Sequence, residues 1–339
     1  MATIVAKIGT SSITGEDGVV DRGAIGAGLP ALGRAGTRPR DPVTLQAVSA
    51  VGQIHLMEAY RRELEGHDLV AGQVLLAPLD FMVRAQYLHA RGTLERLLDL
   101  GVVPVVNEND AIADDEIRFG DNDRLAALVA HLVGAELLVL LTDTAGLLTA
   151  DPRLDASASL IEEIVEVDHA LESIAGGAGT ARGSGGMASK LAAAKLAAWS
   201  GVRTVIAAAT REGVLADALA GRGGVGTVVA AQDRRLPARK LWIAFAVGAS
   251  GTITVDEGAR RALLGGRASL LAAGVTAVEG HFDEDEAVEV VGPDGTVFAK
   301  GLVRADAATI RTMAGRRSAE LPDGTPAWVI HRDELVVLP

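Results

Sequence analysis

Residues 101–124, GVVPVVNENDAIADDEIRFGDNDR, constrain the fold of this chain more than any other stretch. A β-branched apolar run at residues 102–106 ends abruptly in polar residues 107–110, and a second polar group at residues 120–123 opens an apolar helical pattern. This order is typical of a buried parallel strand with polar residues just past its carboxyl end. Open α/β sheets bind ligands at that edge, so we expect a binding site there.

The polar residues of this stretch have two interpretations. Asn and Asp offer the donors, acceptors and charge that suit an amine- and carboxylate-bearing substrate or the shell of Mg²⁺. The same residue types form Asx turns and helix caps, with Asp121 or Asn122 as a cap. The residues of this stretch leave both interpretations open.

The composition indicates a chain with a well-buried core. Its 339 residues are enough for two domains. Hydrophobic residues make up 49% of the chain but aromatic residues only 3%, so Ala, Leu, Val and Gly fill the core, as in helices packed on a Val-rich sheet. The absence of cysteine excludes disulfides, zinc thiolates and cysteine nucleophiles.

Charge and hydropathy argue against nucleic-acid and membrane partners. The formal net charge is −12, which opposes broad contact with nucleic acid or acidic membranes. The start, MATIVAKIGTSS, is a strand pattern and not a signal peptide, and no run of 18 apolar residues occurs. We therefore expect a cytoplasmic protein.

A lysine lies near the end of the first expected strand, residues 3–8. Lys7 comes just before the glycine turn that starts at Gly9. Burying a lysine at the end of a strand is unfavourable unless its ammonium group pairs with an anion. The N–H groups of the glycine turn can donate hydrogen bonds to a phosphate. An edge-strand lysine that reaches water explains the pattern equally well.

Another strand is expected at residues 137–141, and it ends in Thr142 and Asp143. The hydroxyl and the carboxylate suit the polar edges of a nucleotide. Ordinary turn chemistry also accounts for both residues.

A glycine-rich loop, GGAGTARGSGGMASK at residues 176–190, precedes an apolar helix. Its exposed N–H groups and the positive end of the helix favour a phosphate, and Lys190 can reach the same anion. A flexible surface loop is the alternative interpretation. The loop matches neither a Walker A nor a dinucleotide-binding pattern.

The sequence pattern changes near residue 236 and predicts a small β-rich second domain. Short strand candidates with intervening turns are expected at residues 241–245, 251–255, 287–291, 296–302 and 327–330. We assign residues 1–235 to the first domain, 236–240 to a linker and 241–339 to the second domain.

Two lysines beside glycine turns suit the charge that develops on a transferring phosphoryl group. An acceptor carboxylate is already ionised at pH 7, so no general base is needed. Positioning and charge neutralisation then carry the catalysis.

Six motifs carry a resemblance to a known family. In chain order they are VAKIGTSSIT, AVGQ, VVPVVNENDA, FGDNDRLAALVA, LLTDTAGLLTADPR and GSGGMASKLAAAKLA. Together they resemble the glutamate 5-kinases of the amino-acid kinase family, and residues 251–259, GTITVDEGA, resemble the PUA domain of many members. The resemblance implies an α/β fold with a mostly parallel open sheet sandwiched by helices, followed by a β-rich PUA-like domain.

The resemblance implies ATP-dependent phosphorylation of the γ-carboxylate of L-glutamate to γ-glutamyl phosphate, the first step of proline biosynthesis. By the family's motifs, Lys7 and Lys190 neutralise the phosphoryl group in flight and Asp123 organises these lysines. The residues expected to hold glutamate are Asp110, Asn122 and Asn107. The residues expected to hold ATP are Lys7, Thr142, Asp143, Ser184, Gly185, Gly186, Met187, Ala188, Ser189 and Lys190.

The resemblance also implies ATP and Mg²⁺ as cofactors, a homo-oligomer, feedback inhibition by proline and a glutamyl phosphate reductase as partner. We assign no metal-ligating side chain. The alternatives are a family kinase with another carboxylate acceptor, such as aspartate, acetylglutamate or carbamate, and an inactive, regulatory or RNA-directed homologue. Residues 240–339 hold 10 Lys and Arg against 14 Asp and Glu, so they form no basic footprint for RNA.

One segment departs from the family pattern. The family has a helix and a strand, ending in a Ser-Gly-Ala-Ile motif, before its AVGQ helix. Here residues 23–25 run straight into residues 26–30, so both elements and the serine are missing. We expect the sheet to lose a strand and the folding or activity to be impaired, unless residues 26–33 form a rewired loop.

Overall fold

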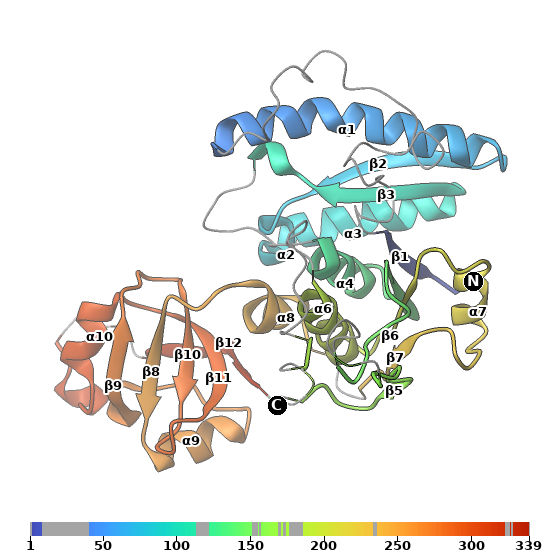
Figure 1. Ribbon diagram of the computed structural model, residues 1–339. Helices are drawn as coiled ribbons and strands as arrows, with labels where there is room; N and C mark the ends of the chain where they lie inside the picture. Colours follow the sequence, from blue (N-terminus) through green and yellow to red (C-terminus); the bar gives the residue numbers. More distant parts are fainter. Residues whose placement is uncertain are drawn as a thin grey trace. The chain divides into compact units, whose positions relative to one another are not determined.

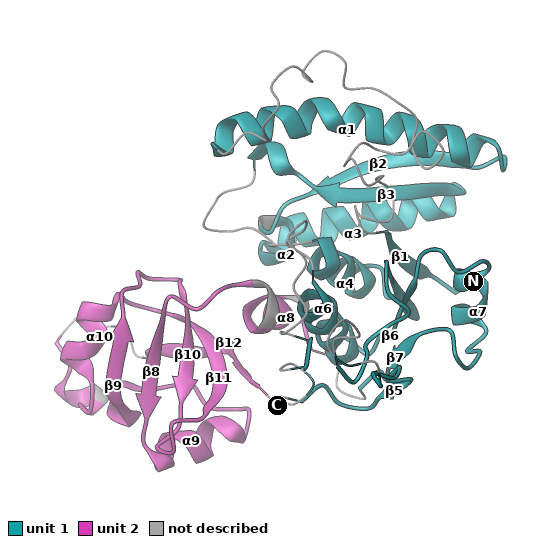
Figure 2. Cartoon of the chain, in the orientation of Figure 1, with its two compact units in different colours: residues 1–235 teal, residues 236–339 magenta. Residues whose placement is uncertain are grey.

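The computed structural model divides into two compact units, residues 1–235 and residues 236–339 (Figure 2). The residues that it describes are 2–8, 41–112, 122–150, 155, 157–168, 171, 174–175, 186–232, 236–322, 326 and 328–338. Residues 236–240, which we assigned to a linker, are part of the second unit. Residues 9–40, which include the place where the sequence lacks a helix and a strand of the family pattern, lie outside the described residues.

The larger sheet of unit 1 has five strands in the order β1-β4-β6-β7-β5 (Figure 1). They are β1 (Ile4–Ile8), β4 (Leu137–Thr142), β6 (Arg203–Ala208), β7 (Thr227–Val229) and β5 (Glu163–Ile164). Every neighbouring pair is parallel except β6 and β7. The strand β4 is buried along its whole length, which explains its continuous apolar sequence LLVLLT.

A second, two-stranded sheet in unit 1 pairs β2 (Val70–Leu76) with β3 (Val102–Glu108) in parallel. The crossover between them contains α2 (Leu79–Met82) and α3 (Arg84–Asp99). Val83 has an extended backbone that separates α2 from α3.

The mostly parallel α/β class is confirmed, and its strands fall into two sheets. Within the described part of the chain, no strand hydrogen-bonds the β2–β3 pair to the five-stranded sheet. The helix α1 (Pro42–Glu65) packs on β2 and on the 3₁₀ turn η2 (Asp110–Ile112). It begins where the Asp41 carboxylate accepts a hydrogen bond from the Thr44 N–H at 2.8 Å.

Two largely buried helices carry residues of the predicted site. The helices α4 (Asn122–Leu132) and α6 (Met187–Trp199) lie side by side (Figure 1). Most of their Leu and Ala side chains are buried, and α4 contacts both β1 and β3. The short helix α7 (Val214–Leu219) packs on β4 and β6.

Unit 2 is built on a five-stranded sheet with the order β12-β11-β10-β8-β9. Its strands are β8 (Gly251–Val255), β9 (Val275–Gly280), β10 (Ala287–Val291), β11 (Val297–Val303) and β12 (Ile330–Val337). The helices are α8 (Ala238–Leu241), α9 (Glu257–Leu264) and α10 (Ala307–Met313), with 3₁₀ turns at Ala272–Gly274 and Ser318–Glu320. Asp256 and Asp306 cap α9 and α10, each accepting a backbone N–H at 2.7 Å.

Two strand predictions in unit 2 are wrong. Residues 241–245 are helical, because Leu241 ends α8 and Trp242–Ala246 continue as a π-helix. A short apolar run such as LWIAF does not distinguish a buried helix from a strand by periodicity. The last strand starts only at Ile330 and runs to Val337, so the prediction at residues 327–330 stops where the strand begins.

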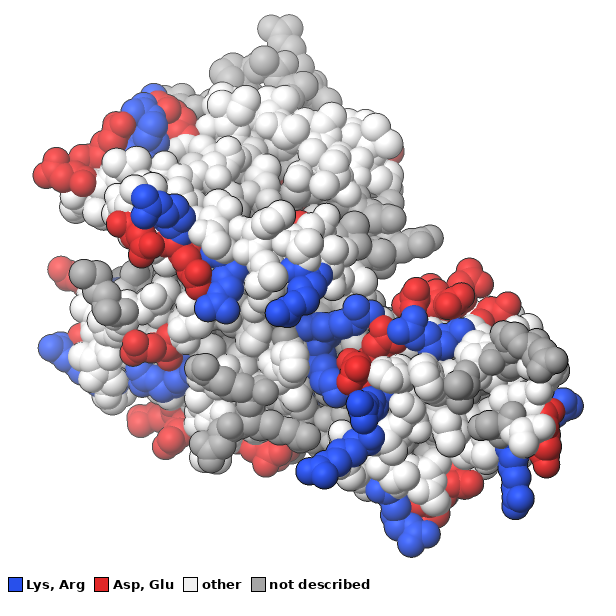
Figure 3. All heavy atoms as spheres, turned by 180° about the vertical axis from the view of Figure 1, so that it is seen from behind, with Lys and Arg blue, Asp and Glu red and all other residues white. Residues whose placement is uncertain are grey.

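The surface carries both signs of charge. On the face seen in Figure 3, acidic and basic side chains are interspersed over both units. Among the described residues, no helix is long and apolar enough to cross a membrane.

Candidate active site

The centre of the candidate site is Asp123, at the start of α4, whose side chain is fully buried. One carboxylate oxygen lies 2.6 Å from Lys7 Nζ and the other lies 3.1 Å from Lys190 Nζ. The Ser189 hydroxyl donates a further hydrogen bond to the second oxygen at 2.7 Å. The structure therefore brings together β1, α4 and α6, and with them the three predicted catalytic residues.

The electrostatics of this cluster leave one surplus positive charge. Burial opposes the ionisation of Asp123, but the nearby Lys7 and Lys190 ammonium groups outweigh it and hold the pKa of Asp123 below its ordinary value. The carboxylate neutralises only one of the two lysines. The Lys7 and Lys190 side chains are 14% and 7% exposed, so the excess charge is only weakly screened by water. This arrangement favours an anion beside the lysines.

The predicted acceptor residues form a second group. Asn107 lies in β3, Asp110 in η2 and Asn122 at the first position of α4. The Asn122 amide donates to Asn107 Oδ1 at 3.0 Å. Because Asn122 precedes Asp123, this acceptor group is covalently joined to the lysine cluster.

Sequence reasoning missed two residues of α1 that hold this group. The Ser49 hydroxyl donates to Asp110 Oδ2 at 2.7 Å, and Asn107 Nδ2 donates to Gln53 Oε1 at 3.1 Å. Gln53 belongs to the AVGQ motif, to which we gave no role. The signal was the spacing, since polar residues four apart on a helix share one face.

The predicted ATP residues lie at two element ends. Thr142 is the last residue of β4, and its hydroxyl donates to Asp143 Oδ1 at 3.1 Å. Gly186 precedes α6, and residues 187–190 form its first turn. Among the described residues, no side chain caps this helix end, and its first N–H groups form the positive end of the helix dipole. Ser184 and Gly185 lie outside the described residues.

The turn after β4 depends on one glycine. Gly146 has a φ of 150°, and a Cβ there would lie 2.6 Å from Thr227 Oγ1 and 2.9 Å from the Thr227 N. The same Thr227 hydroxyl accepts the Leu147 N–H at 2.8 Å, so it is not free to move away. This contact fixes the path of the chain just past Thr142 and Asp143.

We expect Gly146→Ala to lower the free energy of unfolding by about 2–3 kcal/mol, because both backbone strain and overlap with Thr227 oppose the methyl group. The matched control is Gly213→Ala, which has a φ of 69° but nothing within 4 Å of the added Cβ. Urea titrations give the free energy of unfolding of each variant. Both variants have backbone strain but only Gly146→Ala has the overlap with Thr227, so the difference between their losses measures the overlap. Equal losses of stability would show that the contact with Thr227 has no effect.

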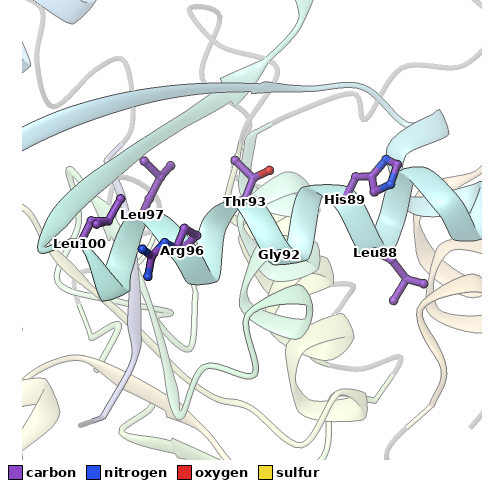
Figure 4. Close-up of a pocket in the computed structure, with 7 residues that line it drawn as sticks. All are labelled: Leu88, His89, Gly92, Thr93, Arg96, Leu97 and Leu100. Carbon is purple, nitrogen blue, oxygen red and sulfur yellow. The ribbon is translucent and has the colours of Figure 1, made fainter.

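A pocket of about 470 Å³ lies elsewhere in unit 1 (Figure 4). It is open and runs along α3 between Leu88 and Leu100. It contains none of the predicted site residues, and only His89 and Arg96 among its lining side chains can carry charge. The concentration of buried charge around Asp123 makes that cluster the better candidate.

Comparisons with known proteins identify the family of this chain. The model of the amino acid kinase family matches residues 2–208, and the model of the PUA domain matches residues 251–325. A glutamate 5-kinase of Nocardia farcinica (strain IFM 10152) is 45% identical over 359 residues, covering 98% of this chain and 96% of that protein. Those of Mycobacterium avium (strain 104) and Mycobacterium tuberculosis (strain ATCC 25618 / H37Rv) are 42% and 47% identical, covering 99% and 94% of this chain and 97% and 84% of the relatives.

These matches do not support the expectation of impaired activity. The chain covers 96% of the Nocardia protein, and Lys7, Asp123 and Lys190 meet within hydrogen-bonding distance. The short segment after β1 therefore does not prevent the assembly of the lysine cluster. The chain belongs to the amino acid kinase family, among its glutamate 5-kinase members, and carries a C-terminal PUA domain.

Proposed function

We propose that this chain is a glutamate 5-kinase, which transfers the γ-phosphoryl group of ATP to the γ-carboxylate of L-glutamate. The observation that carries the proposal is the buried Asp123 between Lys7 and Lys190, directly beside the Asn107, Asp110 and Asn122 group. The names of the full-length relatives support the same reaction.

In the proposed reaction, a γ-carboxylate oxygen of glutamate attacks the γ-phosphorus of ATP. The bond from this phosphorus to the β,γ-bridging oxygen breaks, and ADP leaves with the electron pair. Lys7 and Lys190 stabilise the charge on the oxygens around phosphorus. Asp123 holds both ammonium groups in place and does not itself take a proton, because its pKa is lowered and the acceptor is already ionised.

We assign acceptor binding to Asp110, Asn122 and Asn107. The Asp110 carboxylate and the Asn122 amide oxygen suit the α-ammonium group of an amino acid. Asn122 is exposed and Asp110 is half-buried, so a small molecule can reach both. Their place next to Asp123 puts the acceptor beside the lysines.

We assign ATP binding to the end of β4, with Thr142 and Asp143, and to the loop and first turn that lead into α6, from Ser184 to Lys190. Uncapped N–H groups at a helix start suit phosphate oxygens. Among the described residues, no group of three or more His, Cys, Asp and Glu side chains could hold a metal ion. Mg²⁺ commonly keeps waters and binds through substrate phosphates, so this donor set fits a magnesium ion held mainly by ATP.

The product of this reaction, an acyl phosphate, hydrolyses readily and needs prompt consumption. A reductase for γ-glutamyl phosphate is therefore the partner that we propose, with proline as the feedback inhibitor and a homo-oligomer as the working form. Each follows from the family and belongs to the same proposal of a first step in proline biosynthesis.

An acceptor panel tests the proposal. ADP release is measured with ATP, Mg²⁺ and L-glutamate, L-aspartate or N-acetyl-L-glutamate, and the acyl phosphate is trapped with hydroxylamine. We expect kcat/KM to be at least about 100-fold higher for glutamate, because the analogues lack either the chain length or the ammonium group. Faster turnover of either analogue would assign the chain to another acceptor.

A further inference from the structure

We propose that Gln53 and Ser49 of α1 are positioning residues that make the acceptor site selective for a free ammonium group. This inference rests on the proposed function and extends it to two residues outside the assigned site. Both residues act through others, Gln53 through Asn107 and Asn122, and Ser49 through Asp110.

Three side-chain amides form a chain of hydrogen bonds from three separate elements. Asn122 Nδ2 of α4 donates to Asn107 Oδ1 of β3 at 3.0 Å, and Asn107 Nδ2 donates to Gln53 Oε1 of α1 at 3.1 Å. The direction is the same at each step, from Asn122 towards Gln53. Gln53 is therefore the last acceptor in this row of amide hydrogen bonds.

This direction decides which atom Asn122 presents to a ligand. Since Asn122 uses its nitrogen to reach Asn107, its carbonyl oxygen is the atom left for the acceptor molecule. A positively charged ammonium that donates to this oxygen polarises the amide and strengthens the next bond, and the effect passes on to Gln53. If these hydrogen bonds ran in the opposite direction, Asn122 would present its N–H groups to the ligand and repel the ammonium.

The second contact from α1 orients Asp110 in the same sense. The Ser49 hydroxyl donates to Asp110 Oδ2 at 2.7 Å, which leaves Oδ1 for a ligand. Ser49 and Gln53 are four residues apart on α1 and so lie on one face of the helix. One rigid helix thereby orients both oxygen-bearing groups of the site.

The buried Nε2 atom of Gln53 makes the inference testable. It has no hydrogen-bond partner among the described residues, whereas Oε1 accepts from Asn107. Gln53 is thus needed as an acceptor and not as a donor. Gln53→Glu keeps the accepting oxygen, and Gln53→Leu removes it at similar size.

The experiment measures dissociation constants of L-glutamate and of glutarate, the same molecule without its amino group, by calorimetry on the full chain. We expect Gln53→Leu to lower the ratio of the two affinities about tenfold, because Asn107 loses its acceptor and Asn122 its fixed orientation. Gln53→Glu keeps the ratio of the unmodified chain. Ser49→Ala lowers the ratio, and Ser49→Thr, which keeps the hydroxyl, preserves it.

The control is Ile54→Ala, since Ile54 follows Gln53 on α1 and is 71% exposed. It should leave both affinities and the KM for ATP unchanged. In an Asn107→Ala background, Gln53→Leu should have no further effect, because its effect passes through Asn107. An unchanged ratio in Gln53→Leu, an equal loss in Gln53→Glu, or additive effects with Asn107→Ala would each overturn the inference.

Glutamate binding and acyl phosphate formation are measured in separate experiments. An unmodified chain that binds glutamate but forms no acyl phosphate contradicts the proposed function, while the affinity ratios still decide the role of Gln53. Thermal melting of each variant identifies loss of folding, and the conservative variants Gln53→Glu and Ser49→Thr then decide the outcome.

Discussion

Replacing Asp123 with asparagine should strongly slow phosphoryl transfer and lower the free energy of unfolding by about 3–5 kcal/mol. The carboxylate is fully buried and holds Lys7 and Lys190 at 2.6 and 3.1 Å. Without it, two poorly hydrated ammonium groups lose the carboxylate that holds both of them. We expect them to move apart, so that kcat falls by more than about 100-fold. Urea denaturation and initial rates measure the two effects.

The matched control is Asp217→Asn. Asp217 also pairs with two cations, Arg211 at 3.1 Å and Arg222 at 2.7 Å, but those arginine side chains are 38% and 70% exposed. Exposed ion pairs contribute less than about 1 kcal/mol, so this variant should remain nearly as stable as the unmodified chain. Similar losses from both substitutions would contradict the account of the buried cluster.

The stability difference between the unmodified chain and Asp123→Asn should depend on pH. The folded-state pKa of Asp123 lies below the ordinary value of 3.8, since Lys7 and Lys190 outweigh the opposing effect of burial. Its ionised form therefore stabilises the fold fully above the unfolded-state pKa, and this contribution is lost as pH falls through the lower folded-state pKa. The gap between the two proteins should be largest near neutral pH and shrink at acid pH.

Lys190→Met should lower kcat about 100- to 1,000-fold with little change in the KM for glutamate. In the proposed mechanism, Lys190 stabilises charge that grows on the phosphoryl oxygens during transfer, so its substitution should raise the free energy of the transition state. The remaining Lys7 and Asp123 form a neutral pair at 2.6 Å, and the variant should therefore be more stable than Asp123→Asn. Initial-rate kinetics at varied glutamate and ATP measure the effect.

The control for this substitution is Lys195→Met on the same helix, α6. Asp123 binds Lys7, Ser189 and Lys190, whereas Lys195 lies five residues further along α6, so its substitution should change kcat little. A comparable loss of kcat in the two variants would mean that the net charge of α6, and not the position of Lys190, supports catalysis.

Much of the candidate site could be predicted from the sequence because short motifs mark the ends of buried elements. Lys7 lies near the end of a strand, Asp123 lies in the first turn of a helix and Lys190 follows a glycine-rich sequence. Parallel strands bring such ends to one edge of a sheet. The resemblance to the kinase family then implied a shared catalytic role for them, which the spacing alone did not.

The parts that the sequence did not predict depend on tertiary contacts. Gln53 and Asn107 are 54 residues apart, and neither the amide chain nor its direction leaves a local pattern. Residues 241–245 are apolar enough for either a buried strand or a buried helix, so their sequence does not distinguish the two, and the structure has a helix there. In β12, the charged sequence HRDE hides the strand pattern that packing in the sheet imposes.

The most direct test of the central claim is the formation of γ-glutamyl hydroxamate by the purified chain with ATP, Mg²⁺, L-glutamate and hydroxylamine. We expect a product that forms in step with ADP, saturates with glutamate and disappears in Lys190→Met. A folded, glutamate-binding chain that forms neither hydroxamate nor ADP would contradict it.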